Sequence, residues 1–265
     1  MINNPKGYVV LAGAGPGDPE LITLKLSKAL QRADIIIADR LVNPRIWEEN
    51  APANALIIQA GKQGYHNASF TQEQVTTLII RHATQGKYVV RLKGGDVAFF
   101  SNVLDELEQL VEKEIPYEII PGVTAASGAS AYCGIPLTAR GYAQTVQFLS
   151  FNPTAVYPDA YWQLLANNTD TTVLYMAGKN LSLYLEKLLE MNADPHLPIA
   201  VIEQATTEYQ QVHISTLENA KKDLLTRSFS SPSLVITGKV VELHHSFQWF
   251  TQKKKGSVFL NLSAS

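Results

Sequence analysis

The sequence predicts an α/β protein with two domains, in which a mostly parallel first sheet is followed by a mixed second sheet. Two observations predict the first sheet: short apolar segments that stop at glycine or charged residues, and segments of helical periodicity between them. Such apolar runs are typical of parallel strands buried on both faces. A third observation, a cluster of proline, asparagine and aspartate between Ser150 and Ala160, predicts a linker between domains of residues 1–150 and 151–265.

The first half of the chain alternates between strands and helices. The predicted strands are residues 8–11, 35–37, 56–58, 89–92 and 117–120. Helices are predicted after Pro19, over residues 72–85 and over about residues 102–114. The first helix is expected to turn its leucines towards the core, namely Leu21, Leu24, Leu26 and Leu30. Small residues from Thr124 to Ala131 permit close helix packing or the close approach of a ligand.

The second half has a different order of elements. Strands are predicted at residues 172–175, 198–202, 210–214 and 234–237, and helices at residues 181–191 and 217–226. The order of the last elements indicates a mixed sheet, to which residues 258–262 could add an edge strand. The basic run Lys253, Lys254 and Lys255 is expected to be solvated.

The composition excludes several classes of protein. Hydrophobic residues make up 46% and charged residues 17% of the chain, as in a folded globular protein. A net charge of −2 disfavours binding to nucleic acid or to an anionic membrane, so an anionic ligand would need a local basic cluster. Cys133 is the only cysteine, which excludes an intrachain disulfide and a cysteine-rich metal site. No apolar run reaches ~18 residues and no signal-peptide core is present, so we expect a cytoplasmic protein without a membrane span.

Loops at the carboxyl ends of the predicted strands carry the candidate functional residues. Gly94-Gly95-Asp96 follows the strand around which the first domain is organised, Asp39 and Arg40 follow another, and Lys62 and His66 follow a third. The carboxyl ends of parallel strands meet at one edge of a sheet, where open α/β proteins bind ligands. Two glycines leave backbone groups open to close approach, and Asp96 adds a carboxylate that can accept hydrogen bonds or face a cation. The sequence therefore predicts that these loops share a cleft.

Plainer structural explanations stand beside this one. Gly94-Gly95-Asp96 can simply end a strand in a tight turn, and Asp39 with Arg40 can form a surface ion pair of little energetic value. A lysine such as Lys62 is, by itself, more often solvated, and Met176 at the end of an apolar strand is more often part of a core.

Two kinds of site are not predicted. His66 lacks partners at the spacing of metal ligands, so no metal site is expected. The loop from Gly13 to Pro19 lies between a strand and a helix but has the wrong glycine spacing for a dinucleotide, and Pro16 removes a backbone donor that a phosphate would need.

Taken together and in order, the loops resemble those of the tetrapyrrole methylases, and most of all those of the uroporphyrinogen-III C-methyltransferases. The motifs that carry the resemblance are residues 13–18 (GAGPGD), 39–41 (DRL), 61–62 (GK), 91–96 (RLKGGD), 121–127 (PGVTAAS), 134–138 (GIPLT), 175–176 (YM), 203–206 (EQAT) and 247–250 (FQWF). Each motif is short, but their common order and spacing extend from about Tyr8 to Phe250.

The resemblance implies S-adenosylmethionine bound in a cleft between two α/β domains, a tetrapyrrole substrate and a homodimer. It implies that the following residues hold the cofactor: Pro16, Gly94, Gly95, Asp96, Phe99, Thr124, Ala125, Met176 and Ala205. Asp39 matches the proposed proton acceptor of the family, and Lys62 matches its proposed proton donor. The many carboxylates of the substrate would need local cations, for which Arg40, Lys93 and Arg140 are candidates together with Lys62 and Arg91.

The resemblance also implies the reaction, which is C-methylation of uroporphyrinogen III towards precorrin-2, in the siroheme and cobalamin branch of tetrapyrrole synthesis. The chain departs from the family pattern mainly near the expected substrate. An arginine-containing Gly-Arg-Gly-Gly loop is replaced by Ser101 to Leu104, Ala38 stands in place of a tyrosine and Ala139 in place of a histidine. Two alternatives therefore remain open: a methyltransferase for another precorrin-like tetrapyrrole, and a binding or regulatory homologue with impaired catalysis.

Overall fold

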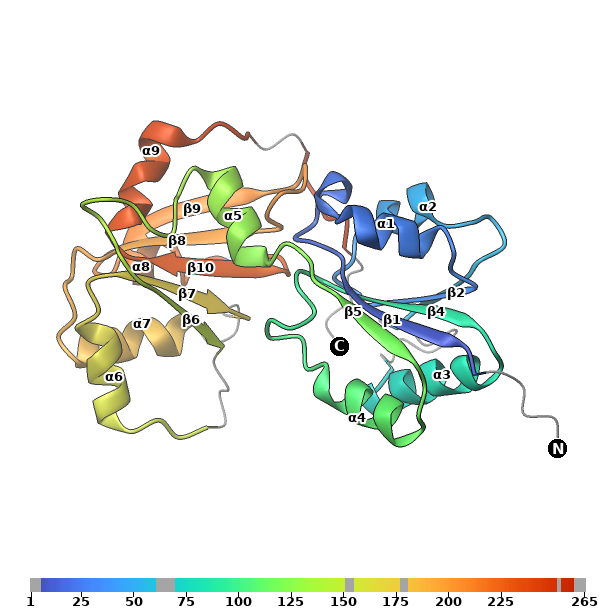
Figure 1. The fold of residues 1–265 in the computed structure, drawn as a ribbon. Helices are drawn as coiled ribbons and strands as arrows, with labels where there is room; N and C mark the ends of the chain where they lie inside the picture. Colours follow the sequence, from blue (N-terminus) through green and yellow to red (C-terminus); the bar gives the residue numbers. More distant parts are fainter. Residues whose placement is uncertain (1–5, 61–69, 151–154, 177–180, 252–253, 260–265) are drawn as a thin grey trace. The chain divides into compact units, whose positions relative to one another are not determined.

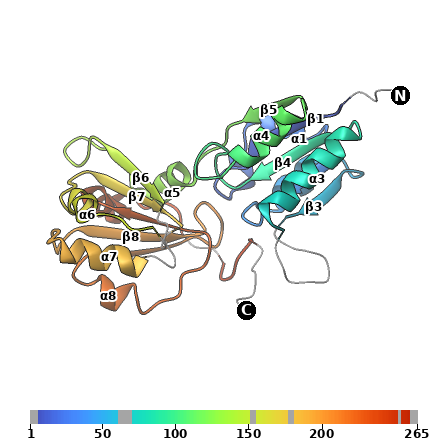
Figure 2. The same cartoon turned by 90° about the horizontal axis from the view of Figure 1, so that it is seen from below.

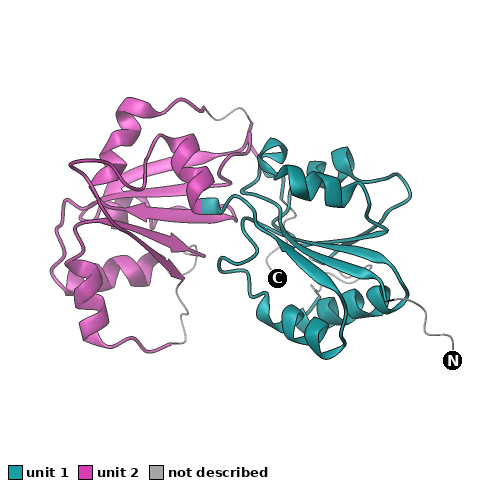
Figure 3. Ribbon diagram, viewed as in Figure 1, with its two compact units in different colours: residues 1–125, 257–265 teal, residues 126–256 magenta. Residues whose placement is uncertain are grey.

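The computed structural model describes residues 6–60, 70–150, 155–176, 181–251 and 254–259 (Figure 1). The chain forms two compact units, one of residues 1–125 and 257–265 and the other of residues 126–256 (Figure 3). The sequence placed this boundary at residue 150. It falls earlier in the structure because helix α5 (Ala125–Cys133) packs its buried residues against strands of the second unit, among them Val173 and Ile202.

Unit 1 is built around a parallel sheet. Its strands are β1 (Tyr8–Gly13), β2 (Ile35–Ala38), β3 (Leu56–Gln59), β4 (Tyr88–Lys93) and β5 (Tyr117–Ile120). Among the described residues they form one five-stranded sheet in the order β3-β2-β4-β1-β5, and each neighbouring pair is parallel. The helices of this unit are η1 (Pro19–Leu21), α1 (Leu24–Leu30), α2 (Arg45–Asn50), α3 (Gln72–Thr84) and α4 (Leu104–Glu112). The predicted strands and the mostly parallel sheet are confirmed.

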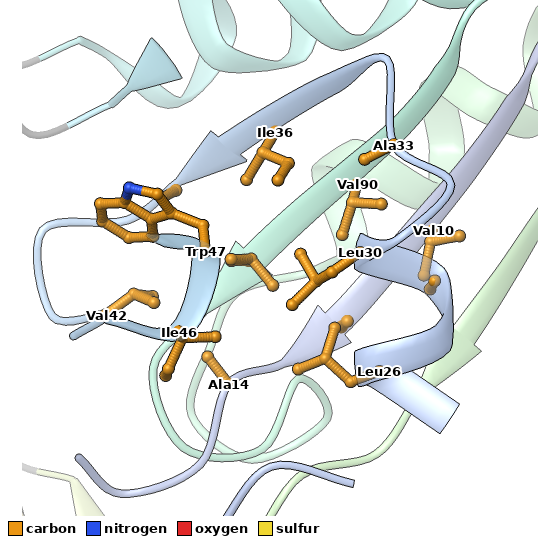
Figure 4. Packing of buried hydrophobic residues seen from close by; sticks show 14 of the residues in the cluster. Val10, Ala14, Leu26, Leu30, Ala33, Ile36, Val42, Ile46, Trp47 and Val90 are labelled. Carbon is orange, nitrogen blue, oxygen red and sulfur yellow. The ribbon is translucent and has the colours of Figure 1, made fainter. Parts of the chain in front are cut away.

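Helices cover both faces of the first sheet because alternate strand residues point to opposite sides. Val10, Ile36 and Val90 pack with α1 and α2 on one face (Figure 4). The other face packs Val9 and Val89 against α3 and α4, which lie side by side (Figure 2).

Helix α1 departs from the predicted apolar face at one position. Thr23 caps the helix by accepting a hydrogen bond from the Leu26 N–H at 3.1 Å. Leu26 and Leu30 are buried, but Leu24 is 82% exposed. Residues two positions apart lie on different sides of a helix, so Leu24 and Leu26 cannot share the apolar face. The prediction for Leu24 was wrong.

Unit 2 contains the mixed sheet that the sequence predicted. Its strands are β6 (Val146–Ser150), β7 (Thr171–Tyr175), β8 (Pro198–Glu203), β9 (Gln211–Thr216) and β10 (Ser233–Thr237). Their order is β6-β7-β10-β8-β9, with β6 and β7 parallel and the other neighbouring pairs antiparallel.

The remaining elements of unit 2 are α6 (Asp159–Ala166), α7 (Leu181–Glu190), α8 (Ala220–Asp223), η2 (Lys239–Leu243) and α9 (His244–Phe247). Helices α6 and α7 cover one face of the sheet through Trp162, Tyr184 and Leu188, and α5 covers the other face. Helix α8 is much shorter than the predicted helix at residues 217–226. Val258 and Phe259 are not in a strand, and the rest of that predicted edge strand lies outside the described residues. None of the helices in the described ranges is long and apolar enough to cross a membrane.

Candidate functional site

The loops at the carboxyl ends of β1 and β4 are joined through their backbones, and the loop after β5 packs closely against both. Gly15 and Gly95 exchange two hydrogen bonds, at 3.0 and 2.7 Å, and the Ala14 N–H donates to the Lys93 carbonyl at 2.8 Å. Strands β4 and β5 flank β1 in the sheet, so the loops that follow all three strands emerge at one edge. The glycine-rich loops after β1, β4 and β5 therefore meet at one edge of the sheet. That the loops of Asp39 and Lys62 share a cleft with Asp96 stays a prediction.

Glycine is required where these backbones approach most closely. A Cβ atom on Gly13 would lie 2.6 Å from the Gly95 carbonyl oxygen and 2.7 Å from the Gly122 nitrogen. A Cβ atom on Gly122 would lie 2.4 Å from the same Gly95 oxygen. Gly95 itself has φ of 69°, a left-handed conformation that side chains other than glycine rarely adopt. The three glycines thus form a layer of bare backbone at the strand ends.

The Asp96 carboxylate ties this layer together. One of its oxygens accepts a hydrogen bond from the Gly122 N–H at 2.7 Å, and the other accepts from the Ala98 N–H at 2.9 Å. The sequence predicted a carboxylate that faces a ligand. The structure shows a carboxylate whose two oxygens already accept backbone hydrogen bonds, so Asp96 positions the loops that a ligand would contact.

The remaining cofactor residues predicted in unit 1 lie on the same loops. Pro16 is buried in the loop after β1, and Gly94 is packed so closely that a Cβ atom would lie 3.1 Å from the Leu41 carbonyl oxygen. Phe99 packs edge to face on Phe100, with ring centroids 5.0 Å apart. Thr124 and Ala125 follow β5, and the Ala125 nitrogen lies 3.5 Å from where a Gly95 Cβ would be.

Asp39 and Arg40 stand immediately after β2. Both are partly buried, and the Arg40 N–H donates to an Asp39 carboxylate oxygen at 2.7 Å. No ion pair joins their side chains within the described part of the chain, in contrast to the surface pair considered from the sequence. The guanidinium of Arg40 has no protein partner among the described residues, and it is therefore available to a substrate carboxylate.

Lys93, a candidate cation for the substrate carboxylates, already has a carboxylate partner in the protein. Its side chain is 3% exposed, and its ammonium donates to the Glu106 carboxylate at 2.9 Å. The same carboxylate accepts from the Arg91 guanidinium at 3.0 Å. Burial lowers the pKa of Lys93, and the Glu106 carboxylate opposes that shift. Lys93 is thus committed to a protein carboxylate, and we do not keep it among the residues that bind substrate carboxylates.

Unit 2 carries the other predicted site residues, again near strand ends. Met176 directly follows β7 and is 59% exposed, which excludes a place in the core. Ala205 is 8% exposed in the loop after β8. Arg140 is exposed in the turn between Ala139 and Ala143 and has no partner in the described segments.

The sequence did not reveal that these loops of unit 2 are conformationally strained. Met176, Gln204 and Thr206 have positive φ angles of 56°, 48° and 69°. A left-handed conformation is an outlier for a β-branched residue such as Thr206. Its N–H is held by the Gln210 side-chain oxygen at 2.7 Å. Backbone strain of this kind clusters at ligand sites, and the only sequence signal for it was position relative to the strands.

Two further expectations concern proton donors and metals. Lys62 and His66, predicted from the loop after β3, lie outside the described residues. Within the described ranges, no group of three or more histidine, cysteine, aspartate or glutamate side chains could hold a metal ion. An open groove between α3 and α4, lined by Gln72 and Arg81 among others, contains none of the predicted site residues.

Comparison with known proteins identifies the family. The family model described as "Tetrapyrrole (Corrin/Porphyrin) Methylases" matches residues 8–221. The chain belongs to this family. It is an S-adenosylmethionine-dependent methyltransferase, so the predicted family, enzyme class and cofactor are confirmed.

Individual relatives agree with this assignment. The chain is 41% identical over 245 residues to a siroheme synthase of Acinetobacter baylyi, a match that covers 92% of this chain and 53% of the relative. It spans about half the length of the curated relatives it matches. A uroporphyrin-III-C-methyltransferase from Thermus thermophilus has a TM-score of 0.75 at 31% identity, over 92% of this chain and 98% of that one. A structure of a Thermus thermophilus uroporphyrin-III C-methyltransferase complexed with S-adenosylhomocysteine has a TM-score of 0.74 at 34% identity, over 89% and 100%.

Proposed function

We propose that this protein methylates carbon atoms of uroporphyrinogen III, with S-adenosylmethionine as methyl donor, towards precorrin-2. The observation that carries the proposal is the layer of bare glycine backbone at the ends of β1, β4 and β5, with Asp39 at the end of the adjacent strand β2. The similarity to uroporphyrin-III C-methyltransferases over nearly the whole of their length supports the choice of substrate.

The loops of unit 1 fit the cofactor. Gly94 and Gly95 carry no side chain, so an adenosine or an amino-acid group can approach the loop after β4 closely, while the N–H and C=O of Gly95 are held by Gly15. In this proposal Pro16, Phe99, Thr124 and Ala125 complete the contacts of unit 1. When bound, the cofactor supplies a methyl group that its sulfonium sulfur has already activated.

Met176 and Ala205 are the proposed cofactor contacts from unit 2. Met176 presents a flexible thioether at a strand end, and its exposure leaves it free to pack on a ligand. Ala205 lies between the strained residues Gln204 and Thr206, so its backbone orientation is fixed by its neighbours.

The protein's part in the reaction is alignment and proton handling. Holding donor and acceptor in the reactive geometry supplies most of the catalysis when the methyl group is already activated. We propose that the Asp39 carboxylate accepts the proton that the substrate releases, and that Lys62 is the proton donor. Arg40, whose guanidinium has no protein partner in the described part of the chain, and Arg140 would bind the substrate carboxylates.

A second candidate keeps the cofactor and changes the acceptor to another precorrin-like tetrapyrrole. The loop before α4 favours it, because Asn102 occupies the place of the family's arginine and holds a left-handed φ of 49°. Its side-chain amide donates to Asp105 at 3.3 Å, so this loop is organised without a cation. A regulatory homologue with impaired catalysis is the third possibility that this substitution leaves.

One assay separates these candidates. The purified protein is incubated anaerobically with S-adenosylmethionine and uroporphyrinogen III, and the product is followed by mass and absorbance. We expect the mass to rise by whole methyl groups while S-adenosylhomocysteine accumulates. Binding of S-adenosylmethionine in a calorimeter without methyl transfer to uroporphyrinogen III would favour the other acceptors or the regulatory homologue. No binding at millimolar cofactor would reject the proposal.

A further inference from the structure

A buried cluster of three charged side chains connects β4 to α4. The Glu106 carboxylate accepts from the Arg91 guanidinium at 3.0 Å through one oxygen and from the Lys93 ammonium at 2.9 Å through the other. The side chains of Glu106, Lys93 and Arg91 are 0%, 3% and 4% exposed. Arg91 also donates to the carbonyl oxygens of Ile37 and Leu92, at 3.3 and 3.2 Å.

This cluster has a net charge of about +1 when both of its cations and its carboxylate are ionised. It contains two cations and one carboxylate, and an uncompensated buried charge is strongly unfavourable. A buried ion pair is also weak support for stability, because apolar residues of similar volume often do as well. We therefore expect a further anion near the cluster. We also expect the cluster to have a role besides holding α4 on the sheet.

Asp39 is the further anion. Ala38 on β2 pairs with Leu92 on β4, and the Asp39 N–H donates to the Leu92 carbonyl at 3.0 Å, so Asp39 and Lys93 occupy matching positions on adjacent strands. Matching positions in a sheet point to the same face. The Asp39 carboxylate attracts the Lys93 ammonium and counteracts the effect of burial on the Lys93 pKa. With Asp39 included, two cations are accompanied by two carboxylates, and among the described residues the Lys93 ammonium forms its ion pair with Glu106, not with Asp39.

We propose that Glu106 is a positioning residue, which fixes the Lys93 ammonium beside Asp39 so that this charge orients the Asp39 carboxylate for proton transfer. The inference rests on the proposed function, in which Asp39 is the proton acceptor. Glu106 touches neither substrate nor cofactor and acts through Lys93. Lys93 is correspondingly a positioning cation, unlike Arg40, whose guanidinium has no partner among the described residues.

The arrangement makes a prediction about pH. The charged groups that face Lys93 within the described residues are Glu106 from α4, Arg91 from its own strand and Asp39 from the end of β2. Burial and Arg91 lower the Lys93 pKa from its usual value of 10.5, whereas Glu106 and Asp39 raise it. Because the ammonium is the working form, activity is present below that pKa and is lost as the pH rises through it. The pH–rate profile should thus have an alkaline limb, in which the turnover rate falls as the pH rises, at a pH below the usual lysine pKa of 10.5.

The test compares pH–rate profiles of methyl transfer for the wild type, Glu106→Gln, Lys93→Met and the control Glu108→Gln. Glu108 is exposed on the same helix, so its variant makes the same chemical change without touching the cluster. In Glu106→Gln the alkaline limb should move at least about one pH unit lower, because the carboxylate that stabilises the ammonium is gone. In Lys93→Met, kcat should fall by up to about 100-fold while cofactor affinity stays unchanged, as expected for a misplaced catalytic group. Glu108→Gln should superimpose on the wild type.

Several outcomes would overturn the inference while leaving the proposed function standing. One is a folded Lys93→Met that turns over like the wild type, and another is a Glu106→Gln profile that superimposes on the wild-type profile. A loss of thermal stability without a shift of the limb would show a purely structural role. If neither variant folds, the wild-type profile decides, because activity that persists up to the usual lysine range contradicts the proposed role of Lys93. Absence of methyl transfer by the wild type would instead reject the proposed function.

Discussion

Replacing Asp96 with asparagine should loosen the three loops that the glycine layer joins. The aspartate accepts two backbone hydrogen bonds with its two oxygens, from Gly122 at 2.7 Å and from Ala98 at 2.9 Å. Asparagine has the same shape but only one acceptor, and its NH₂ group would face one of these N–H donors. At least one hydrogen bond is lost, and the other loses its assistance from the negative charge.

The size of the effect follows from these contacts. Removing a hydrogen bond to a charged group lowers the free energy of unfolding by about 1.5–3 kcal/mol. Asp96 is only partly buried, so water can replace part of what is lost, and we expect the free energy of unfolding to fall by about 1–2 kcal/mol. For a chain of this size such a change lowers the melting temperature by roughly 2–8 °C.

The assay combines thermal unfolding with calorimetric titration of S-adenosylmethionine. Asp105→Asn is the control, because Asp105 is exposed and, within the described part of the chain, its carboxylate accepts one long hydrogen bond of 3.3 Å from Asn102. Cofactor affinity should fall in Asp96→Asn and stay unchanged in the control. The reason is that the Asp96 carboxylate, which follows Gly95, no longer holds the Gly122 N–H. A melting temperature and an affinity both equal to those of the wild type would refute the role assigned to Asp96.

Three further predictions concern the close backbone contacts, the chemistry and the assembly. Gly122→Ala should lower the melting temperature and abolish cofactor binding, because its Cβ would lie 2.4 Å from the Gly95 carbonyl oxygen. Gly141→Ala is the steric control for binding, because its Cβ would meet nothing within 4 Å; its left-handed φ of 83° costs some stability, but its cofactor affinity should stay unchanged. Equal cofactor affinities of the two variants would contradict this. Asp39→Asn should keep cofactor affinity and lose turnover by ~10²–10⁴-fold in single-turnover measurements, and wild-type turnover would remove Asp39 from the mechanism. Light scattering at micromolar concentration should give twice the chain mass of 29.1 kDa, and a monomer at every concentration would reject the homodimer.

The first sheet was predictable because its signals are local. Its strands are short apolar runs, and a run such as Val89 to Leu92 is interpretable without knowledge of what packs on it. Strand β6 was missed for the opposite reason. Every residue of Val146–Ser150 is only partly buried, and its polar and apolar residues do not form the continuous run expected of a buried parallel strand. Its assignment depends on its pairing with β7, and the sequence predicts the strand β7 but not this pairing.

The candidate site was predictable in its parts and not in its contacts. Glycines after strands indicated where backbone would be bare, but which backbones touch depends on the order of strands in the sheet. Lys93 shows the limit most clearly. It stood among candidate substrate cations because its partner Glu106 lies thirteen residues further along the chain and meets it only through the packing of α4 on β4.

Met176 shows how the structure can decide between two explanations that the sequence left open. As a core residue, Met176 would stabilise the fold through the burial of its side chain, but that side chain is 59% exposed. It also holds a left-handed φ of 56°, which costs free energy that no burial of its own side chain offsets. Ala205, the other cofactor residue predicted in unit 2, is likewise flanked by residues with positive φ. Strain that is retained without a gain in packing favours a functional role, and it falls at the positions that the family resemblance, by an independent argument, assigned to the cofactor.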